Sequence, residues 1–138
     1  MDSIDKKILA FLQSDGRVSY STLGKEIGLT STSISQRVQK MVDTGVIKGF
    51  GVQLDHTKLG IGIQALISVK LNFTRIESFY SAMKTFEEVE FGYRVTGEDC
   101  MVLKVNLRDN THLLDFINRV STFGLTETKV IIEQVIGR

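Results

Sequence analysis

The sequence predicts an α+β protein with two domains, an N-terminal winged helix-turn-helix and a C-terminal ferredoxin-like βαββαβ sandwich. Three observations predict this fold class. Short helical patterns separated by glycines occupy the first third of the chain. Strand-like and helix-like segments then alternate to the end, in an order typical of an α+β sandwich. The charge is also uneven, because residues 16–51 carry a net charge of +3 and residues 52–138 a net charge of −1.

Three helices are predicted in the first domain. Over residues 2–14 the apolar residues recur at steps of three and four, which is typical of an amphipathic helix. A second helix is predicted over residues 20–27, with Ser19 as its N-cap and Gly28 as its stop. A third helix follows Thr30, a suitable N-cap. Helix, tight glycine turn and helix form the spacing of a helix-turn-helix unit.

The first domain is expected to end in a wing. Residues 46–54 alternate apolar and other residues around two glycines, which predicts a short two-stranded wing. We therefore expect a first domain over residues 1–54, a hinge over 55–61 and a second domain over 62–138.

The second domain is predicted to form one antiparallel sheet with two helices on one face. Its strands are rich in Ile, Val and Leu at both alternating positions, so we expect the other face to be buried against a second copy of the chain. The residues that indicate this contact are Leu66, Val69, Leu103, Val105, Val130 and Ile132. The expected strands are 63–72, 90–96, 100–107 and 126–136, and the expected helices are 75–86 and 111–120.

Composition and cysteine content exclude several classes of protein. No apolar run approaches the roughly 20 residues needed to span a bilayer, so no membrane role is expected. The N-terminal MDSIDKK lacks the pattern of a signal peptide, and we expect a cytoplasmic protein. One cysteine, Cys100, and two histidines give no metal-ligand spacing and no internal disulfide. We find no catalytic constellation, and we predict neither an enzyme nor a cofactor.

The outward face of the third helix is predicted to bind double-stranded DNA. On a helical projection of about 100° per residue, short polar side chains, glutamines and cations lie opposite the apolar stripe. Residues 30–40 contain no acid, whereas a merely solvated face, the alternative, usually mixes Glu with Lys. Such side chains reach base edges and phosphates in a major groove. The candidate DNA-binding residues are Arg17, Thr32, Ser33, Gln36, Arg37, Gln39, Lys40 and Lys48.

Seven motifs, spread over both domains, together identify a resemblance. They are Asp5-Lys6-Lys7-Ile8-Leu9, Asp15-Gly16-Arg17-Val18-Ser19, Gly28-Leu29-Thr30, Arg37-Val38-Gln39-Lys40-Met41, Gly45-Val46-Ile47-Lys48-Gly49-Phe50, Val95-Thr96-Gly97 and Thr126-Glu127-Thr128. In this order they resemble the Lrp/AsnC, or feast/famine, family of transcription regulators. The resemblance implies a winged helix-turn-helix and a ligand-sensing βαββαβ domain. It also implies dimers that assemble further into octamers of four dimers, and control by amino acids or related metabolites.

An effector site is expected at the loop before the third strand of the second domain and at the start of the last strand. A free amino acid needs a carboxylate for its ammonium group and N–H or hydroxyl donors for its carboxylate. The candidate effector-binding residues are Gly97, Glu98, Asp99, Cys100, Thr126 and Thr128. The chain departs from the family at Cys100, where relatives commonly place an acid, so Asp99 must supply it. It also departs at Gly24, where alanine is usual and glycine costs about 1 kcal/mol of helix propensity.

Three other functions compete with regulated DNA binding. The domain of residues 62–138 is also compatible with a metabolite-binding or assembly module that has no effector response, since many functions share this fold. An acylphosphatase-like enzyme would need an arginine near the first strand, and residues 60–64 contain none. A pure sensor that has lost DNA binding is disfavoured by the acid-free segment.

Overall fold

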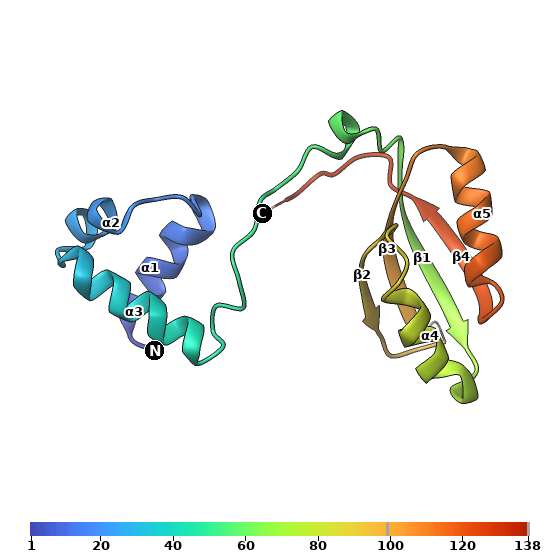
Figure 1. Cartoon of the computed structure of the whole chain (residues 1–138), viewed down its shortest axis with the longest axis horizontal. Helices are drawn as coiled ribbons and strands as arrows, with labels where there is room; N and C mark the ends of the chain where they lie inside the picture. The colour runs from blue at the N-terminus through green and yellow to red at the C-terminus, as the bar shows by residue number, and fades with distance from the viewer. Residues whose placement is uncertain (99, 138) are drawn as a thin grey trace. The chain divides into compact units, whose positions relative to one another are not determined.

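The computed structural model describes residues 1–98 and 100–137, and the chain forms two compact units over residues 1–53 and 54–137 (Figure 1). The first unit contains the helices α1 (Ser3–Ser14), α2 (Tyr20–Ile27) and α3 (Ser31–Asp43). The helices α2 and α3 begin at the residues that the sequence predicts, and α1 begins one residue later than predicted, at Ser3. No helix among the described residues is long and apolar enough to cross a membrane.

Side-chain caps fix the three helix starts. Asp2 caps α1, Ser19 accepts a hydrogen bond from the N–H of Thr22, and Thr30 accepts one from the N–H of Ser33. Each cap satisfies a backbone donor that has no partner within its helix. The apolar sides of the helices then meet in one core, whose fully or nearly fully buried residues are Ile8, Leu23, Ile34, Val38 and Met41.

Gly24 has a packing role that its helix propensity does not reveal. A methyl group at this position would lie 2.4 Å from the carbonyl oxygen of Leu29, in the turn between α2 and α3. The same turn is closed by a 2.8 Å hydrogen bond from the N–H of Leu29 to the carbonyl of Gly24. The glycine therefore lets the two backbones approach closely, which offsets its cost in the helix.

The predicted two-stranded wing is not formed, and this part of the sequence prediction is wrong. Residues 46–53 contain no strand in the part of the chain that the structure describes. The N–H of Ile47 bonds back to the carbonyl of Met41, and the side chains of Phe50 and Val52 are exposed. An isolated pair of strands has marginal stability unless one of its faces is buried, and in this segment Ile47 is partly buried while residues 48–53 are exposed.

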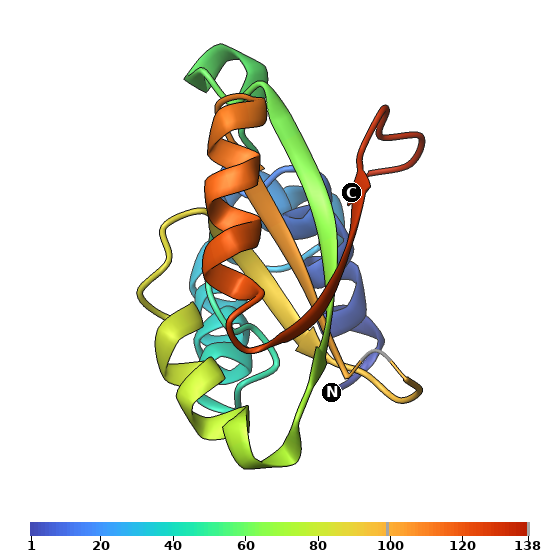
Figure 2. The ribbon, with the colours of Figure 1, turned by 90° about the vertical axis from the view of Figure 1, so that its right-hand side faces the viewer.

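The second unit is a four-stranded antiparallel sheet in the order β2-β3-β1-β4, with α4 and α5 on one face (Figure 2). This architecture confirms the ferredoxin-like prediction. The short 3-10 helices η1 (His56–Leu59) and η2 (Phe73–Arg75) precede β1 and α4. The other elements are β1 (Ile63–Leu71), α4 (Ile76–Met83), β2 (Val89–Arg94), β3 (Met101–Leu107), α5 (Asn110–Val120) and β4 (Gly124–Val130).

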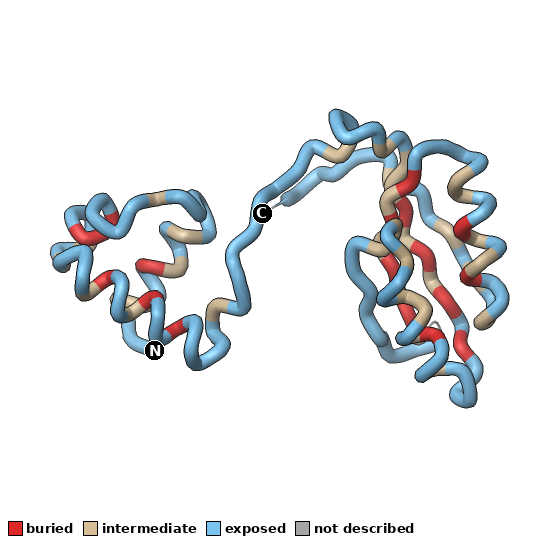
Figure 3. Tube along the Cα trace, in the orientation of Figure 1, coloured by how far each residue is buried: buried red, intermediate tan, exposed pale blue. Residues whose placement is uncertain are grey.

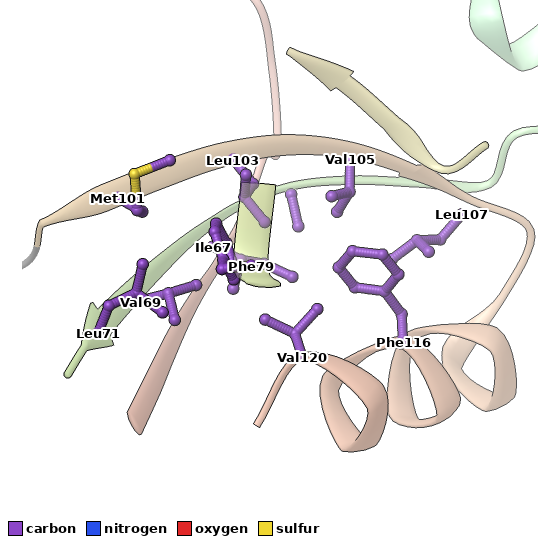
Figure 4. Packing of buried hydrophobic residues seen from close by; sticks show 11 residues of the cluster. Ile67, Val69, Leu71, Phe79, Met101, Leu103, Val105, Leu107, Phe116 and Val120 are labelled. Carbon is purple, nitrogen blue, oxygen red and sulfur yellow. The ribbon is translucent and has the colours of Figure 1, made fainter. Parts of the chain in front are cut away.

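The core of the second unit lies between the helices and the sheet (Figure 4). Every second residue is buried from Ala65 onward in β1 and throughout β3, as the two-residue period of a strand requires (Figure 3). Phe79 of α4 and Phe116 of α5 are completely buried against these strands. The remaining buried members are Ala65, Ile67, Val69, Leu71, Met101, Leu103, Val105, Leu107 and Val120.

The residues chosen from the sequence for the contact with a second copy do not share one face. Val69, Leu103 and Val105 lie in the core beneath the helices, so they are not available to another subunit. Leu66 points to the opposite face, while Val130 is half-exposed at the end of the edge strand β4. The uncovered face is mixed, because β1 also places Gln64, Ser68 and Lys70 there.

The last strand is shorter than the sequence predicts. β4 ends at Val130, which pairs with Ala65 near the start of β1. The N–H of Ile131 makes one more hydrogen bond, to the carbonyl of Gln64, and then the chain leaves the sheet. Ile132, the next residue, is 98% exposed although β1 extends to Ile63.

Candidate nucleic-acid interface

The outer face of α3 is exposed to solvent, because the opposite face packs into the core of the first unit. Ile34, Val38 and Met41 are buried, and this fixes the rotation of the helix about its own axis. Thr32, Gln36, Gln39 and Lys40 are therefore exposed, and Ser33 is half-buried.

Four of the predicted DNA-binding residues lie around one hollow. Ser33, Gln36, Arg37 and Lys40 line a depression of about 510 Å³, together with residues 1, 2 and 5 at the start of the chain. A hydroxyl, an amide and an ammonium group thus lie on one side of α3 over about two turns. These are groups that bond base edges and phosphates.

The other candidates lie apart from this group. Arg17 lines a separate depression of about 380 Å³ with Tyr20 and Phe50. Gln39 donates a 2.8 Å hydrogen bond to Asp43, four residues further along α3. Lys48 is exposed in the segment that follows α3.

Arg37 is already engaged inside the first unit. Its Nη1 lies 2.8 Å from Asp2 Oδ2 and 2.8 Å from Asp5 Oδ1, so one guanidinium nitrogen joins two carboxylates. The backbone N–H of Asp5 and then the Arg37 guanidinium lower the pKa of Asp2 from 3.8 to about 2. The sequence prediction did not include the two aspartates, although their i to i+3 spacing ahead of an apolar stripe is a capping signal.

The predicted effector loop is a tight connection between β2 and β3. The N–H of Val95 bonds to the carbonyl of Cys100 at 2.9 Å, and Gly97 adopts a φ of 103°, which only glycine adopts readily. Glu98 is exposed, while Asp99 lies outside the described residues. Cys100 is half-buried, and its sulfur accepts a 3.1 Å hydrogen bond from the N–H of Leu71.

The two predicted effector threonines lie at the same end of the sheet as this loop. Val69 of β1 pairs with Met101 on one side and with Thr126 on the other. Thr128, two residues further along β4, pairs with Ile67, and both threonines are half-buried. The strand β1 therefore separates the loop from the threonines within one subunit.

A polar cluster near α5 was not predicted from the sequence. Glu88 accepts hydrogen bonds from His112 Nε2, at 3.0 Å, and from Arg119, whose guanidinium stacks on Phe86 and Phe116. Partial burial disfavours the ionised carboxylate, but the hydrogen bonds from Arg119 and His112 outweigh it and lower the pKa of Glu88 from 4.5 to about 2. The contacts hold α5 against the residues that precede β2.

Comparison with known proteins identifies the family. Residues 1–42 match the AsnC-type helix-turn-helix domain, and residues 64–138 match the Lrp/AsnC ligand binding domain. The chain is 33% identical to the HTH-type transcriptional regulator LrpC of Bacillus subtilis, over 98% of its own length and 94% of that protein. The chain belongs to the Lrp/AsnC family. It is an HTH-type transcriptional regulator with a ligand-binding domain.

Other members of the Lrp/AsnC family agree in sequence and in structure. The regulator AldR of Mycolicibacterium smegmatis is 33% identical over 99% of the chain and 84% of its own length. The structure of B. subtilis LrpC has a TM-score of 0.94 at 32% identity and covers 100% of this chain and 99% of its own. That of E. coli AsnC has a TM-score of 0.90 at 26% identity, with 100% and 96% covered. No group of three or more His, Cys, Asp or Glu within the described ranges is placed to hold a metal.

Proposed function

We propose that this Lrp/AsnC regulator reads its operator with the outer face of α3. The observation that supports this most is the grouping of Ser33, Gln36 and Lys40 on one side of a helix whose other side is buried. Gln36 is assigned to a base edge and Lys40 to a phosphate, because a planar amide bonds bases in two places and an ammonium group is a point charge. Arg17 and Lys48 are assigned to flanking phosphates. We propose that the regulator acts in the cytoplasm and catalyses no reaction.

We further propose that the regulator works as a dimer, and that four dimers form an octamer. The uncovered face of the sheet carries Leu66, Val102, Phe91 and Tyr93, which a second copy can cover. A sheet with one bare and partly apolar face is typical of a domain that associates. A twofold dimer presents two copies of α3 to the DNA.

Selection of bound fragments from the host genome tests this proposal. Because two recognition helices are related by a twofold axis, we expect the enriched fragments to contain an inverted repeat with half-sites about one helical turn apart. Light scattering of the same protein should give at least the mass of a dimer. Fragments without a shared sequence, or a monomer that binds a single half-site, would contradict the proposal.

The ligand of the second domain is proposed to be a free amino acid. Glu98 and Asp99 supply carboxylates for its ammonium group, and Thr126 and Thr128 supply hydroxyl donors for its carboxylate. Because β1 lies between the loop and the threonines of one subunit, we propose that the loop of one dimer and the threonines of a neighbouring dimer complete the site.

Calorimetric titration of the twenty amino acids tests this site. Some amino acid should bind at millimolar concentration or tighter, and Thr126→Val should weaken it by about 1 kcal/mol, roughly fivefold, because it removes one hydroxyl at nearly constant volume. Thr111→Val, at the exposed start of α5, is the matched control and should change nothing. If Thr126→Val and Asp99→Ala both bind the amino acid with unchanged affinity, neither residue belongs to the site. No binding by any of the twenty would favour an assembly module without effector response.

A further inference from the structure

We propose that Arg37 is a positioning residue, which ties the recognition helix α3 to the capped start of α1 and thereby sets the sequence preference without itself reading a base. This inference rests on the proposed role of α3. It differs from the sequence prediction, which placed Arg37 among the residues that touch DNA.

Asp2 and Asp5 each use one carboxylate oxygen to cap α1 and the other to bind Arg37. Asp2 Oδ1 accepts the N–H of Asp5, and Asp5 Oδ2 accepts the N–H of Asp2, each at 2.9 Å, which closes the capping box of α1. The remaining oxygens, Asp2 Oδ2 and Asp5 Oδ1, both bind Arg37 Nη1. One side chain of α3 therefore holds both carboxylates that begin α1.

This tie acts on the residues that are proposed to read DNA. Gln36 precedes Arg37, while Ser33 and Lys40 lie one turn before and after it on the same side of α3. Beneath them, α1 and α3 pack through apolar side chains of the shared core, including Ile8. Apolar contacts are not directional, whereas a charge-assisted hydrogen bond at fixed geometry resists rotation of one helix against the other.

Electrostatics disfavours Arg37 as a phosphate ligand. The side chain of Asp5 is 15% exposed and that of Arg37 30% exposed, so this ion pair is partly shielded from solvent. If Arg37 moved to a phosphate, two carboxylates would be left without their partner beside the polyanion. Kept in place, Arg37 reduces the charge of this group from −2 to −1.

The two roles of Arg37 predict opposite effects of neutralising its partners. The probes are an operator selected from the genome and an unrelated duplex of the same length. Asparagine caps helices about as well as aspartate, so Asp2→Asn with Asp5→Asn keeps one oxygen for each cap bond and replaces the oxygens that bind Arg37 by uncharged NH2 groups. We expect this double variant to lose about tenfold in preference for the operator over the unrelated duplex, since close ion pairs couple strongly. Glu26→Gln, an exposed neutralisation on α2, should leave the preference unchanged.

Three further results decide the proposal. Arg37→Gln should lower the preference for the operator as much as the double asparagine variant does. The variant that combines Arg37→Gln with Asp2→Asn and Asp5→Asn should lose no more preference than either. Arg37→Lys should keep part of the preference that Arg37→Gln loses. Tighter binding of both duplexes by the asparagine variant, with a salt slope lowered by about one in Arg37→Gln, would make Arg37 a phosphate ligand and refute the proposal. A lower Tm with an unchanged preference, measured well below the Tm, would also refute it. If the wild-type protein prefers no fragment, the proposed role of α3 itself fails.

Discussion

Replacing Phe116 by alanine should lower the free energy of unfolding of the second unit by about 3–5 kcal/mol. Phe116 is completely buried between α5 and the sheet, and its ring meets that of Phe86 edge to face with the centroids 5.9 Å apart. The Arg119 guanidinium also lies 5.3 Å from the ring centroid. The substitution therefore leaves a cavity and removes two ring contacts. Urea unfolding of the full chain, at one fixed protein concentration, measures the loss.

Leu114→Ala is the matched control for this prediction. Leu114 lies on the same helix but is 59% exposed, so its truncation should cost less than about 1 kcal/mol. A similar loss in the two variants would mean that α5 does not present Phe116 to the core.

Gln36→Ala and Lys40→Ala should affect DNA binding in different ways. If Gln36 bonds a base edge, its loss should cost about 1–3 kcal/mol at the operator and relax the preference at one base position. If Lys40 contacts a phosphate, its loss should weaken all duplexes and lower the slope of log affinity against log salt by about one. Fluorescence anisotropy over a series of salt concentrations separates the two effects.

Matched substitutions elsewhere control for residue type. Gln13→Ala on the exposed side of α1 and Lys84→Ala after α4 should leave affinity and salt slope unchanged. An equal effect of Gln36→Ala on the operator and on unrelated DNA would contradict the assignment of Gln36 to a base.

Local signals in the sequence were sufficient for the helices of the first unit. The caps Ser19 and Thr30 act on N–H groups three residues away, so neighbours in sequence decide the structure. The ferredoxin-like architecture of the second unit also followed from the pattern of elements, because few ways of connecting βαββαβ segments are compact and right-handed.

A count of apolar residues in the strands does not distinguish the two faces of the sheet. Val69, Leu103 and Val105 do not form a second apolar face, because they occupy alternate positions that all point to the helices. Sorting β1 by odd and even positions separates Val69 from Gln64 and Ser68 on the open face, and sorting β3 separates Leu103 and Val105 from Val102. The wing prediction was wrong for a different reason, since strand pairing over residues 46–54 needs a partner that no local pattern supplies.

The partners of Arg37 and Glu88 depend on tertiary structure. Arg37 meets Asp2 across 35 positions in the chain, and Glu88 meets Arg119 across 31. A single sequence shows that each residue is charged but not which opposite charge it meets. The candidate site could therefore be predicted as a helix face, while the internal role of Arg37 required the structure.

One binding measurement tests most directly whether α3 reads the operator. The protein that carries Ser33→Ala, Gln36→Ala and Lys40→Ala together should keep its fold, because these side chains lie outside the core. Measured by anisotropy at fixed salt, it should bind a selected operator no more tightly than an unrelated duplex. Operator affinity and preference equal to those of the wild-type protein would contradict the claim and move recognition to another surface.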